Sequence, residues 1–481
     1  MILEVLADAR QIVQRLDAGA AQPVGAYGSR RRIVVDPATE QAIAEVAMAS
    51  ATDVDAAVAA ARRAFETWSG TSPRERIELL DRVIDRYDAA AEDLATAMTA
   101  EMGSPLAFSR TAQFGSGRAH LRTAAAILED FRFEERDDGV LLTKLPIGVC
   151  ALITPWNWPM NQLLVKVAPA LAAGCTVVVK PSEFSPLSSL RLAEAIREAG
   201  LPVGVFNLVN GDAEAGEALA AHPDVDMVSF TGSHAAGVAV ARAAAGTIKR
   251  VHQELGGKSA FIILDDADLE TAVRACVAGC FMNSGQSCAA PTRLLVPRHI
   301  VGRAEEIARE VAASIVVGPP LAANAELGPL VNARQFDRVQ RMIAAGQGEG
   351  ARLVAGGLGR PAGLERGYFT RPTVFSAVEP DMSIAMEEIF GPVLSIIPHD
   401  GDGEATQLAN RSVYGLAAYV RSADLDRANR VARALRVGTV YVNDGGWNPT
   451  IPVGGFKRSG NGREHGKAGL ESFLELRAIA T

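Results

Sequence analysis

The sequence predicts an α/β protein made of two units, each with a largely parallel β-sheet. The chain has 481 residues, more than one hydrophobic core usually serves, so two or three domains are expected. From about residue 140 onward, short β-rich segments alternate with Ala- and Leu-rich helical segments, which is typical of βαβ units. The alternation restarts after LGGKS at 255–259, which indicates a seam near residue 255.

The expected elements follow in order along the chain. A helix is expected over 1–17, a Thr/Asp cap signal opens a helix at 52–68, and two more helices should lie near 74–101 and 106–132. Strands are then expected within LLTKLPIGVCALITPWN, TVVVKPSE, VFNLVNG and VDMVSFTG, with helices near 162–173, 188–199 and 213–221. Beyond the seam, strands are expected in SAFIIL, TRLLVP, ARLVAGG, FTRPTVFSAV and GTVYVND, and helices in LETAVRACVAGCF, AEEIAREVAASI and LDRANRVARALR.

Bulk composition narrows the function. Hydrophobic residues make up 48% and charged residues 22%, as in ordinary globular proteins. The net charge of −8 gives no electrostatic attraction to phosphate backbones, so nucleic acid is not an expected partner. A run of about 18 apolar residues is lacking, so no membrane span is expected. Five cysteines do not make a disulfide framework, and a reducing, cytoplasmic setting is predicted.

Cys288 is the candidate nucleophile. It follows Gly285 and two polar residues, in a segment between an expected helix and an expected strand. A lone cysteine is more often an inert core residue, but this placement favours an exposed turn from which a thiolate can attack a substrate. Cys276 and Cys280 are four residues apart in an apolar helix and are interpreted as core residues, so no metal site is predicted.

Two further residues suit cysteine-based chemistry. Glu254 precedes a Gly-Gly pair, and a carboxylate with a raised pKa can activate the water that hydrolyses a thioester. By itself, such a glutamate is equally well explained as a solvated strand end. Asn157 lies between two tryptophans and two prolines in TPWNWP, where its amide can be held rigidly as a donor to an oxyanion. The plainer interpretation of that motif is a rigid aromatic turn.

Three segments are compatible with a dinucleotide site. KPSE at 180–183 ends a strand, where Lys180 and Glu183 could hold ribose hydroxyls. FTGSHAAG at 230–237 leads from a strand into a helix and presents backbone N–H groups to a pyrophosphate, although Gly232 and Gly237 lack the usual G-x-G-x-x-G spacing. EEIFGPV at 387–393 combines two acids, an aromatic ring and a Gly-Pro turn. Taken singly, each segment is equally well an ordinary polar turn.

In order and spacing, these motifs resemble the aldehyde dehydrogenase superfamily. The matching segments are TPWNWP, KPSE, FTGS, ELGGKS, GQSC, EEIFGP, VND and GGFKRSGNGRE, and the resemblance runs from about residue 34 to the end. It implies oxidation of an aldehyde to a carboxylic acid with NAD. Cys288 would be the nucleophile, Glu254 the general base, and Asn157 would form the oxyanion hole with the Cys288 backbone N–H.

The resemblance also implies a cofactor site. The residues expected at NAD are Thr154, Pro155, Trp156, Lys180, Ser182, Glu183, Gly232, Ser233, Gly237, Leu255, Glu388 and Phe390. Lys180 and Glu183 would hold the adenosine ribose, and Glu388 the nicotinamide ribose beside Phe390. A carboxylate at Glu183 would repel a 2′-phosphate, which favours NAD and leaves NADP as the alternative. Lys166 matches a recurrent family lysine whose role is left open.

The implied architecture is the aldehyde dehydrogenase fold. It would comprise a Rossmann-like NAD-binding domain over 1–127 and 147–255, an α/β catalytic domain over 256–455, and a small β oligomerisation arm over 128–146 and 471–481. Because dimers and tetramers are the family norm, a homodimer or homotetramer is expected. The first 33 residues do not match the strand pair with which many relatives begin, but this departure touches no catalytic position.

The implied aldehyde tunnel would be lined by Trp158, Asn161, Gln162, Val165, Trp447, Asn448 and Val453. Val165 and Val453 are small where some relatives carry large aromatic residues, which indicates a roomy tunnel. Asn161, Gln162 and Asn448 could meet a distal polar group on the substrate. The segment MNSGQSCAAPTRLLVP is similar to a branch that acts on long oxo-fatty acids.

Two other functions are weighed. A CoA-acylating semialdehyde dehydrogenase would pass the acyl group to coenzyme A, but that branch lacks the glutamate found here at 254. A non-catalytic relative would keep the fold and lose Cys288, Glu254 or Asn157, and all three are present. Hydrolysis of a thioester is therefore favoured.

Overall fold

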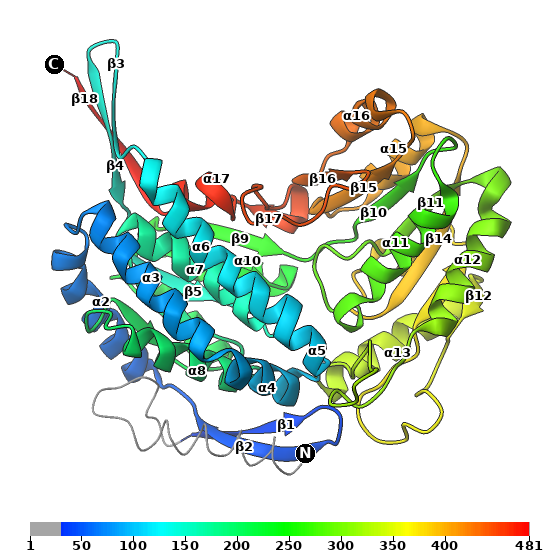
Figure 1. The fold of residues 1–481 in the computed structure, drawn as a ribbon, viewed down its shortest axis with the longest axis horizontal. Coiled ribbons are helices and arrows are strands. Elements are labelled where there is room, and N and C mark those ends of the chain that lie inside the picture. The colour runs from blue at the N-terminus through cyan, green and yellow to red at the C-terminus, as the bar shows by residue number, and fades with distance from the viewer. Residues whose placement is uncertain (1–29, 481) are drawn as a thin grey trace.

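The structure, a computed structural model, describes residues 30–480, so the helix expected over 1–17 lies outside the described residues. Two lobes lie side by side, and a narrow sheet projects from one of them (Figure 1). Within residues 30–480, no helix combines the length and apolar character needed to cross a bilayer. The predicted α/β class is confirmed, because each lobe contains a largely parallel sheet.

The first lobe contains a six-stranded sheet with the order β17-β9-β8-β5-β6-β7. Its strands are β5 (Val149–Ile153), β6 (Thr176–Lys180), β7 (Phe206–Leu208), β8 (Met227–Gly232), β9 (Arg250–Leu255) and β17 (Gly460–Asn461). The pairs are parallel except for β17, which runs antiparallel to β9. Strands β5 and β6 are buried along their whole length, as expected for a parallel sheet covered on both faces.

Helices cover both faces of this sheet (Figure 1). They include α2 (Ala51–Trp68), α7 (Pro159–Ala173), α8 (Pro186–Glu198), α9 (Ala213–Ala221) and α10 (His234–Ala244). These agree with the expected helices to within a few residues. The cap of α2 differs from the predicted Thr/Asp signal: Ser50 is the N-cap and accepts from the Asp53 N–H, while Asp53 closes a capping box from the third helical position, so the helix begins one residue earlier, at Ala51.

Two expected helices are interrupted. The helix predicted over 74–101 is two helices, α3 (Pro73–Ala89) and α4 (Ala91–Met102), which meet at Ala90 with φ −93° and ψ 7°. Tyr87 and Leu94, seven residues apart on either side of Ala90, pack into the same core, and the Ala90 N–H donates to the Arg86 and Tyr87 carbonyls where α3 ends. The helix predicted over 106–132 comprises α5 (Leu106–Phe108), the π-helical turn η1 (Ser109–Gln113) and α6 (Phe114–Asp130).

The second lobe contains a seven-stranded sheet with the order β12-β13-β14-β11-β10-β15-β16. Its strands are β10 (Ala260–Ile263), β11 (Arg293–Pro297), β12 (Arg352–Ala355), β13 (Thr373–Ser376), β14 (Val393–His399), β15 (Ala417–Arg421) and β16 (Thr439–Val442). Its helices include α11 (Leu269–Phe281), α12 (Val301–Ser314), α13 (Ala333–Gly348), α15 (Asp402–Arg411) and α16 (Leu425–Ala434). Only β12 is antiparallel to its neighbour.

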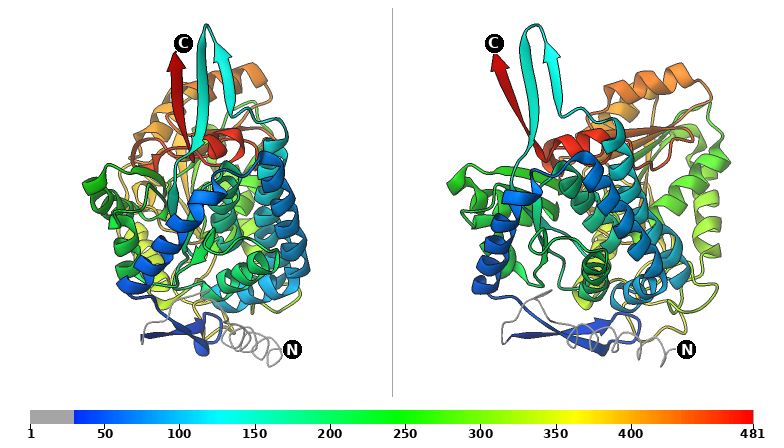
Figure 2. Two further views of the ribbon diagram at one scale, coloured as in Figure 1. Left: turned by 90° about the vertical axis from the view of Figure 1, so that its left-hand side faces the viewer. Right: turned by 60° about the vertical axis from the view of Figure 1, so that its left-hand side comes forward.

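A three-stranded antiparallel sheet projects from the first lobe, at the end opposite the hairpin of β1 (Arg31–Asp36) and β2 (Gln41–Ala47) (Figure 2). It contains β3 (Glu134–Asp137), β4 (Val140–Pro146) and β18 (Leu474–Ala480). Gly148, with φ +135°, separates β4 from β5, and a Cβ there would lie 1.8 Å from Asp226 Oδ2. Because the chain turns at this glycine, the predicted β-rich segment LLTKLPIGVCALITPWN forms two strands: β4 in the projecting three-stranded sheet and β5 in the six-stranded sheet.

The two lobes are joined where β9 ends and β10 begins, at 256–259. The carboxyl ends of β5, β6, β8 and β9 lie at one edge of the first sheet. Ligands bind at such edges in open α/β sheets. The segments that follow these strands hold most of the residues singled out in the sequence.

Candidate active site

Cys288 follows a strained loop that links α11 to β11. Asn283, Ser284 and Gly285 have successive φ values of 56°, 56° and 72°, a region that residues other than glycine rarely adopt. At Gly285, a Cβ would lie 2.2 Å from the backbone carbon of Gly391, so only glycine fits. Strain of this kind concentrates at functional sites. Here it brings Cys288 to a partly exposed position beyond a buried loop.

The turn that carries Asn157 is hydrogen-bonded to the cysteine loop. The Asn157 side chain is buried, and its Nδ2 donates to the Gln286 carbonyl at 2.9 Å. The Asn157 backbone carbonyl accepts from Asn283 Nδ2 at 2.8 Å. The next residue, Trp158, donates from Nε1 to Ser287 Oγ at 2.8 Å. Since a primary amide has two N–H groups, Asn157 can anchor the loop with one and face a substrate oxygen with the other.

Glu254, near the end of β9, lies beside the thiol of Cys288. It is buried, and its Oε2 has no hydrogen-bond partner among residues 30–480. Burial raises the pKa of Glu254 well above its usual value, Glu464 raises it further, and a hydrogen bond with Cys288 opposes the rise. Burial, and then the charges of Glu254 and Glu388, likewise raise the pKa of Cys288. Each group must therefore lose a proton before it can act as base or nucleophile.

A buried ion pair lies close to Glu254. Lys166 Nζ on α7 contacts the Glu464 carboxylate and donates to Ser229 Oγ at 3.1 Å. Burial alone would raise the pKa of Glu464, but Lys166 beside it brings the pKa down to about 2. Glu464 thus stays ionised, and its negative charge contributes to the raised pKa of Glu254.

The carboxyl ends of β5 and β6 bring together four of the predicted cofactor residues, namely Thr154, Lys180, Ser182 and Glu183. Lys180 is buried, its Nζ donates to the Gly211 carbonyl at 2.7 Å, and it lies 3.9 Å from Glu183 Oε2. The Thr154 N–H donates to the Lys180 carbonyl at 3.1 Å. Ser182 is buried directly after this strand end. This edge therefore offers a cation and a carboxylate side by side.

The start of α10 is shaped by two glycines and a serine. Gly232 ends β8, and Ser233 caps the helix by accepting from the Ala236 N–H at 3.4 Å. At Gly237, a Cβ would lie 2.7 Å from Leu255 Cδ2, so the absence of a side chain lets Leu255 pack against the first turn. The N–H groups of a first helical turn have no partners within the helix and attract anions such as a pyrophosphate.

Residues from the second lobe face this edge. The rings of Trp156 and Phe390 meet edge to face, with centroids 5.5 Å apart. Glu388 Oε1 accepts from the Gly257 N–H at 2.9 Å, and burial raises the Glu388 pKa to about 7 against that hydrogen bond. Carboxylates from both lobes and an open helix start between them fit a dinucleotide.

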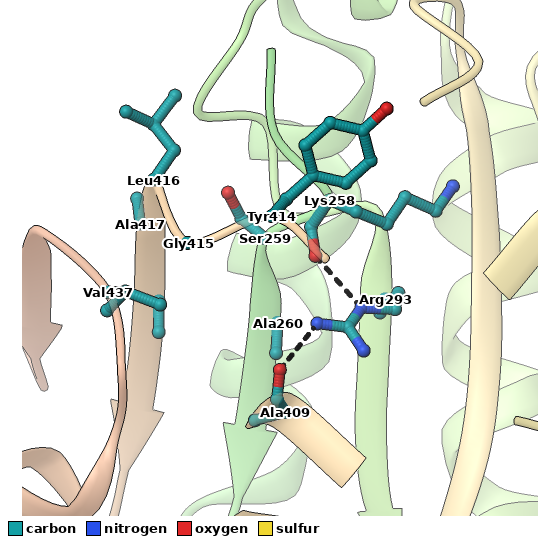
Figure 3. Close-up of a pocket in the computed structure, with 11 residues that line it drawn as sticks. Lys258, Ser259, Ala260, Arg293, Ala409, Tyr414, Gly415, Leu416, Ala417 and Val437 are labelled. Atoms are coloured by element: carbon teal, nitrogen blue, oxygen red, sulfur yellow. Dashed lines mark hydrogen bonds between the residues drawn. The ribbon is translucent and has the colours of Figure 1, made fainter. Parts of the chain in front are cut away.

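Arg293 holds the segment that joins the lobes. Its buried guanidinium donates to the carbonyls of Lys258, Leu408 and Ala409 at 2.9, 2.9 and 3.0 Å. Figure 3 shows it pointing toward Ala409 beside a small cavity, with the Lys258 side chain directed away from it. Burial lowers the Lys258 pKa to about 7, and its Nζ has no hydrogen-bond partner in the described part of the chain.

Comparison with known proteins then decides the family. A model described as "Aldehyde dehydrogenase family" matches residues 26–479. The chain belongs to the aldehyde dehydrogenase family. It is 52% identical to a 3-succinoylsemialdehyde-pyridine dehydrogenase of a Pseudomonas species, over 94% of this chain and 95% of the relative.

Solved aldehyde dehydrogenases agree with this assignment. One is aldehyde dehydrogenase C of Pseudomonas syringae, solved as a cysteine-to-alanine variant in complex with NAD+ and octanal. It is 53% identical to this chain with a TM-score of 0.94, and the match covers 95% of this chain and 94% of that chain. Another is the betaine aldehyde dehydrogenase of Staphylococcus aureus in complex with NAD+. It is 36% identical with a TM-score of 0.91, and the match covers 95% of this chain and 92% of that chain. The predictions of the aldehyde dehydrogenase fold, of an aldehyde-oxidising enzyme and of NAD as cofactor are confirmed. The role of each site residue stays a prediction.

The residues predicted to line the aldehyde tunnel of this dehydrogenase fall into two groups. Four of them lie at the start of α7, three and four residues apart, which is the spacing of one face of a helix: Trp158, Asn161, Gln162 and Val165. Asn161 Oδ1 is hydrogen-bonded to His120 Nε2 at 2.8 Å. These residues therefore lie on one side of the first turns of α7, directly after Asn157, and Gln162 and Val165 are buried there.

The other three predicted tunnel residues come from 447–453. The Trp447 ring contacts the His120 ring at 5.7 Å, which brings it next to Asn161. Asn448 is exposed, and its Oδ1 accepts from the Thr450 N–H at 2.9 Å within its own turn. Val453 pairs with Glu464 in an isolated β-bridge. Val453 is thereby joined through Glu464 to Lys166 on α7.

Several site residues of this aldehyde dehydrogenase were missed by reasoning from the sequence. Glu464 lies in the matched segment GGFKRSGNGRE, but its partner Lys166 is 298 positions away, so only charge complementarity hinted at the pair. His120 and His465 carry no local motif, and their contacts arise from folding alone. Lys258 lies in the matched segment ELGGKS, where it could have been noted as a candidate, and its charge interacts with that of Glu388.

Proposed function

We propose that this aldehyde dehydrogenase forms a thioester between its substrate and Cys288, and that water activated by Glu254 hydrolyses the thioester to the carboxylic acid. The observation that carries the proposal is the contact between the Cys288 thiol and a buried carboxyl that has one unpartnered oxygen and a raised pKa. Such a carboxyl can accept a proton from a neighbour near neutral pH.

In the first half-reaction, Glu254 accepts the thiol proton and the Cys288 sulfur bonds to the aldehyde carbon. The oxygen that becomes negative accepts hydrogen bonds from Asn157 Nδ2 and the Cys288 backbone N–H. Both donors sit on a loop and turn that are already bonded together, so little reorganisation is needed. When bound, NAD+ supplies the hydride acceptor that this oxidation requires.

Before the second half-reaction, Glu254 releases the thiol proton to solvent, which is the proton that accompanies NADH formation. Glu254 then takes a proton from water as the water oxygen adds to the thioester carbon, and it returns this proton to the departing sulfur. Asn157 again holds the oxyanion. As it collapses, the carbon–sulfur bond breaks, the carboxylic acid leaves, and the sulfur departs as a thiolate that regains a proton. The fixed negative charge of Glu464 keeps Glu254 basic enough for this step.

The residues proposed to bind NAD come from both lobes. Lys180 and Glu183 would hold the adenosine ribose, the start of α10 at Ser233 the pyrophosphate, and Glu388 the nicotinamide ribose with Phe390 beside the ring. The buried Lys180, the capped helix start and the paired rings support these roles. Glu183 supports NAD over NADP because a carboxylate repels a 2′-phosphate.

For the substrate, we propose a medium-sized aldehyde. The relatives named above act on a succinoylsemialdehyde-pyridine or bind octanal, and both molecules are longer than acetaldehyde. The small side chains at Val165 and Val453, where some relatives carry large aromatic residues, support an extended substrate. An oxo-fatty acid aldehyde stays a prediction from the segment around Cys288.

We further propose the domain division set out from the sequence, with a homo-oligomer built through the projecting sheet. Strand β18 carries exposed Leu476 and Ile479 along a sheet edge, and such edges recruit a partner strand. All five cysteines are free thiols, which supports the cytoplasmic setting predicted from composition.

The test is NADH formation, followed by absorbance, with purified enzyme, NAD+ and a panel of aldehydes. The Cys288→Ala variant is run in parallel and should form no NADH. Adding coenzyme A and analysing the product separates hydrolysis from acyl transfer, and we expect free acid only. An acyl-CoA product would overturn hydrolysis, and full activity in Cys288→Ala would overturn the nucleophile.

A further inference from the structure

Four amide side chains from both lobes meet where the turn of Asn157 contacts the loop before Cys288. They are called the amide network here and consist of Gln113, Asn157, Asn283 and Gln286. Each of the four is at most 5% exposed. Gln113 and Asn157 belong to the first lobe, and Asn283 and Gln286 to the second. Because buried amides need hydrogen-bond partners, their mutual bonds fix how the two lobes meet at this point.

The Asn157 backbone carbonyl is held by two of these amides. Gln113 Nε2 donates to it at 3.1 Å and Asn283 Nδ2 at 2.8 Å. A carbonyl oxygen has two lone pairs, so both are used and the peptide group of Asn157 is fixed. Gln113 must present its NH2 end here, because its other neighbour is Asn283 Oδ1, at 3.5 Å, which can only accept.

The Gln286 carbonyl joins the two expected oxyanion donors. It accepts from Asn157 Nδ2 at 2.9 Å and from Asn283 Nδ2 at 3.3 Å. The Cys288 N–H, the other expected donor, follows two residues later in the same loop. The Gln286 side chain is itself held, since it donates to the Asn283 carbonyl at 3.2 Å and accepts from the Val331 N–H at 3.0 Å. One donor from each lobe is therefore placed relative to the same carbonyl.

A π-helical turn brings Gln113 into the amide network. In η1, the Phe114 N–H donates to the Ser109 carbonyl, five residues back. Such turns are rare and occur frequently at functional sites. Thr99 Oγ1 donates to Ser109 Oγ at 2.9 Å and anchors the start of the turn. Ser109 and Gln113, at the two ends of the turn, are both fully buried, so the turn directs the Gln113 amide into the interior.

We propose that Gln113 and Asn283 are positioning residues for the oxyanion hole. By saturating the Asn157 carbonyl, they hold the Asn157 side chain so that one N–H bonds to Gln286 and the other faces the substrate oxygen that becomes negative. Hydrogen-bond donors stabilise such a charge best when they are already in place, so the amide network contributes to both half-reactions. This inference rests on the proposed function, because it takes Asn157 and the Cys288 N–H as the oxyanion donors.

Three reactions of Cys288 differ in whether they form an oxyanion. Aldehyde oxidation forms one, and so does acylation of the sulfur by p-nitrophenyl acetate, which releases p-nitrophenolate and needs no hydride transfer. Alkylation by iodoacetamide displaces iodide at a saturated carbon and forms none. Cys288 is the target of the reagent because the other four cysteines are buried. A change in folding or in the thiol itself would alter all three rates, whereas lost positioning alters only the first two.

The test variants are Gln113→Met, which keeps the side-chain length without the donor, and Asn283→Gly, which removes the amide at a φ of 56° that glycine adopts freely. In each, we expect first-turnover NADH formation and ester acylation to fall by about one to two orders of magnitude. The alkylation rate and the KM for NAD+ should not change. Gln340→Met is the matched control and should change none of these rates, since Gln340 Nε2 donates to Thr370 Oγ1 at 3.0 Å, outside the amide network.

The outcomes are distinct. Oxidation and acylation rates that match the parent in both Gln113→Met and Asn283→Gly overturn the positioning role, and so does alkylation that falls by the same factor as acylation. Thermal unfolding identifies a variant that does not fold, and the other variant then decides. Because both amides act on one carbonyl, the double variant should lose little more than either single variant. The proposed function fails separately, if Cys288→Ala releases p-nitrophenolate at the rate of the parent.

Discussion

Glu254 and Glu464 are buried carboxyl groups in the same region, yet their surroundings drive their pKa values in opposite directions. Glu464 contacts Lys166, and its pKa falls to about 2. Glu254 has an oxygen with no partner in the described part of the chain, and its pKa is raised. The difference separates a fixed charge, which organises the protein, from a titrating group, which can take part in the reaction.

The largest expected effect is on the reacting sulfur. Cys288→Ala should lower NADH formation by about four orders of magnitude or more, because no other group supplies the nucleophile. Its stability should barely change, since the side chain is partly exposed. Cys280→Ala is the matched control, and it should keep activity but lose about 1–2 kcal/mol of stability by leaving a cavity in the core. Steady-state rates and denaturant unfolding measure both, and a reversed pattern would mean that the two cysteines were assigned wrongly.

Removing one partner of the fixed-charge pair comes next. Lys166→Met leaves Glu464 buried and unpaired, and should lower the free energy of unfolding by about 3–5 kcal/mol. Replacing both partners, as Lys166→Met with Glu464→Leu, should recover much of that loss because no buried charge remains. Denaturant unfolding of the three proteins is the measurement. A single Lys166→Met variant as stable as the parent would show that the pair is not buried in solution.

Altering the titrating carboxyl should affect chemistry and spare stability. Glu254→Gln removes the base that activates water, so we expect the steady-state rate to fall by about two to three orders of magnitude. Because Glu254 also accepts the thiol proton in the proposed mechanism, rapid mixing should show a slow first turnover of NADH as well as a slow steady state. A steady-state rate within a few-fold of the parent would remove Glu254 from the mechanism.

The smallest expected effect is on pH dependence. Because the pKa values of Cys288 and Glu254 are both raised and their deprotonated forms react, kcat/KM should increase with pH as these groups lose their protons, at a higher pH than for a free thiol and carboxyl. The two carboxyl groups should change the free energy of unfolding in opposite directions as the pH changes.

The stabilising contribution of Glu254 is present below its pKa in the unfolded chain and is lost as the pH rises through its raised pKa in the folded protein. That of Glu464 is present above its unfolded pKa and is lost as pH falls toward about 2.

The measurement is the free energy of unfolding across pH for the parent and for two variants, Glu254→Gln and Glu464→Gln. It tests the direction in which each carboxyl changes stability with pH. The difference between Glu254→Gln and the parent should change at high pH, and that for Glu464→Gln at low pH. Two differences that run parallel with pH would show that the carboxyls do not differ in the way described.

Local pattern was enough to predict much of the fold. The helices α9 and α11 coincide with their predicted ranges, because Asp212 and Asp268 cap them and their apolar residues recur at helical spacing. The break at Ala90 could not be predicted, since alanine favours helix and neither glycine nor proline marks the position. Strand β14 and helix α13 also went unpredicted, although Asn332 caps α13 and its buried residues recur at helical spacing, so its pattern was present in the sequence.

The candidate site could likewise be predicted only in part. The sequence was enough to single out Cys288, Glu254 and Asn157 as candidates, because their motifs are local and because the order of the motifs resembles a family. The contacts of Lys166 with Glu464 and of His120 with Asn161 join residues far apart in sequence, so periodicity carries no trace of them. The left-handed backbone at Asn283 and Ser284 is equally invisible, because neither residue is a glycine.

The hydrogen bond from Trp158 to Ser287 has a consequence for anyone who wishes to redesign this enzyme. The same indole ring is predicted to line the aldehyde tunnel, and it tethers the residue next to Cys288. Trimming Trp158 to admit bulkier aldehydes would also release Cys288 from its neighbour's anchor. Substrate range and turnover are therefore coupled traits at this position, and a library that varies Trp158 should vary Ser287 with it.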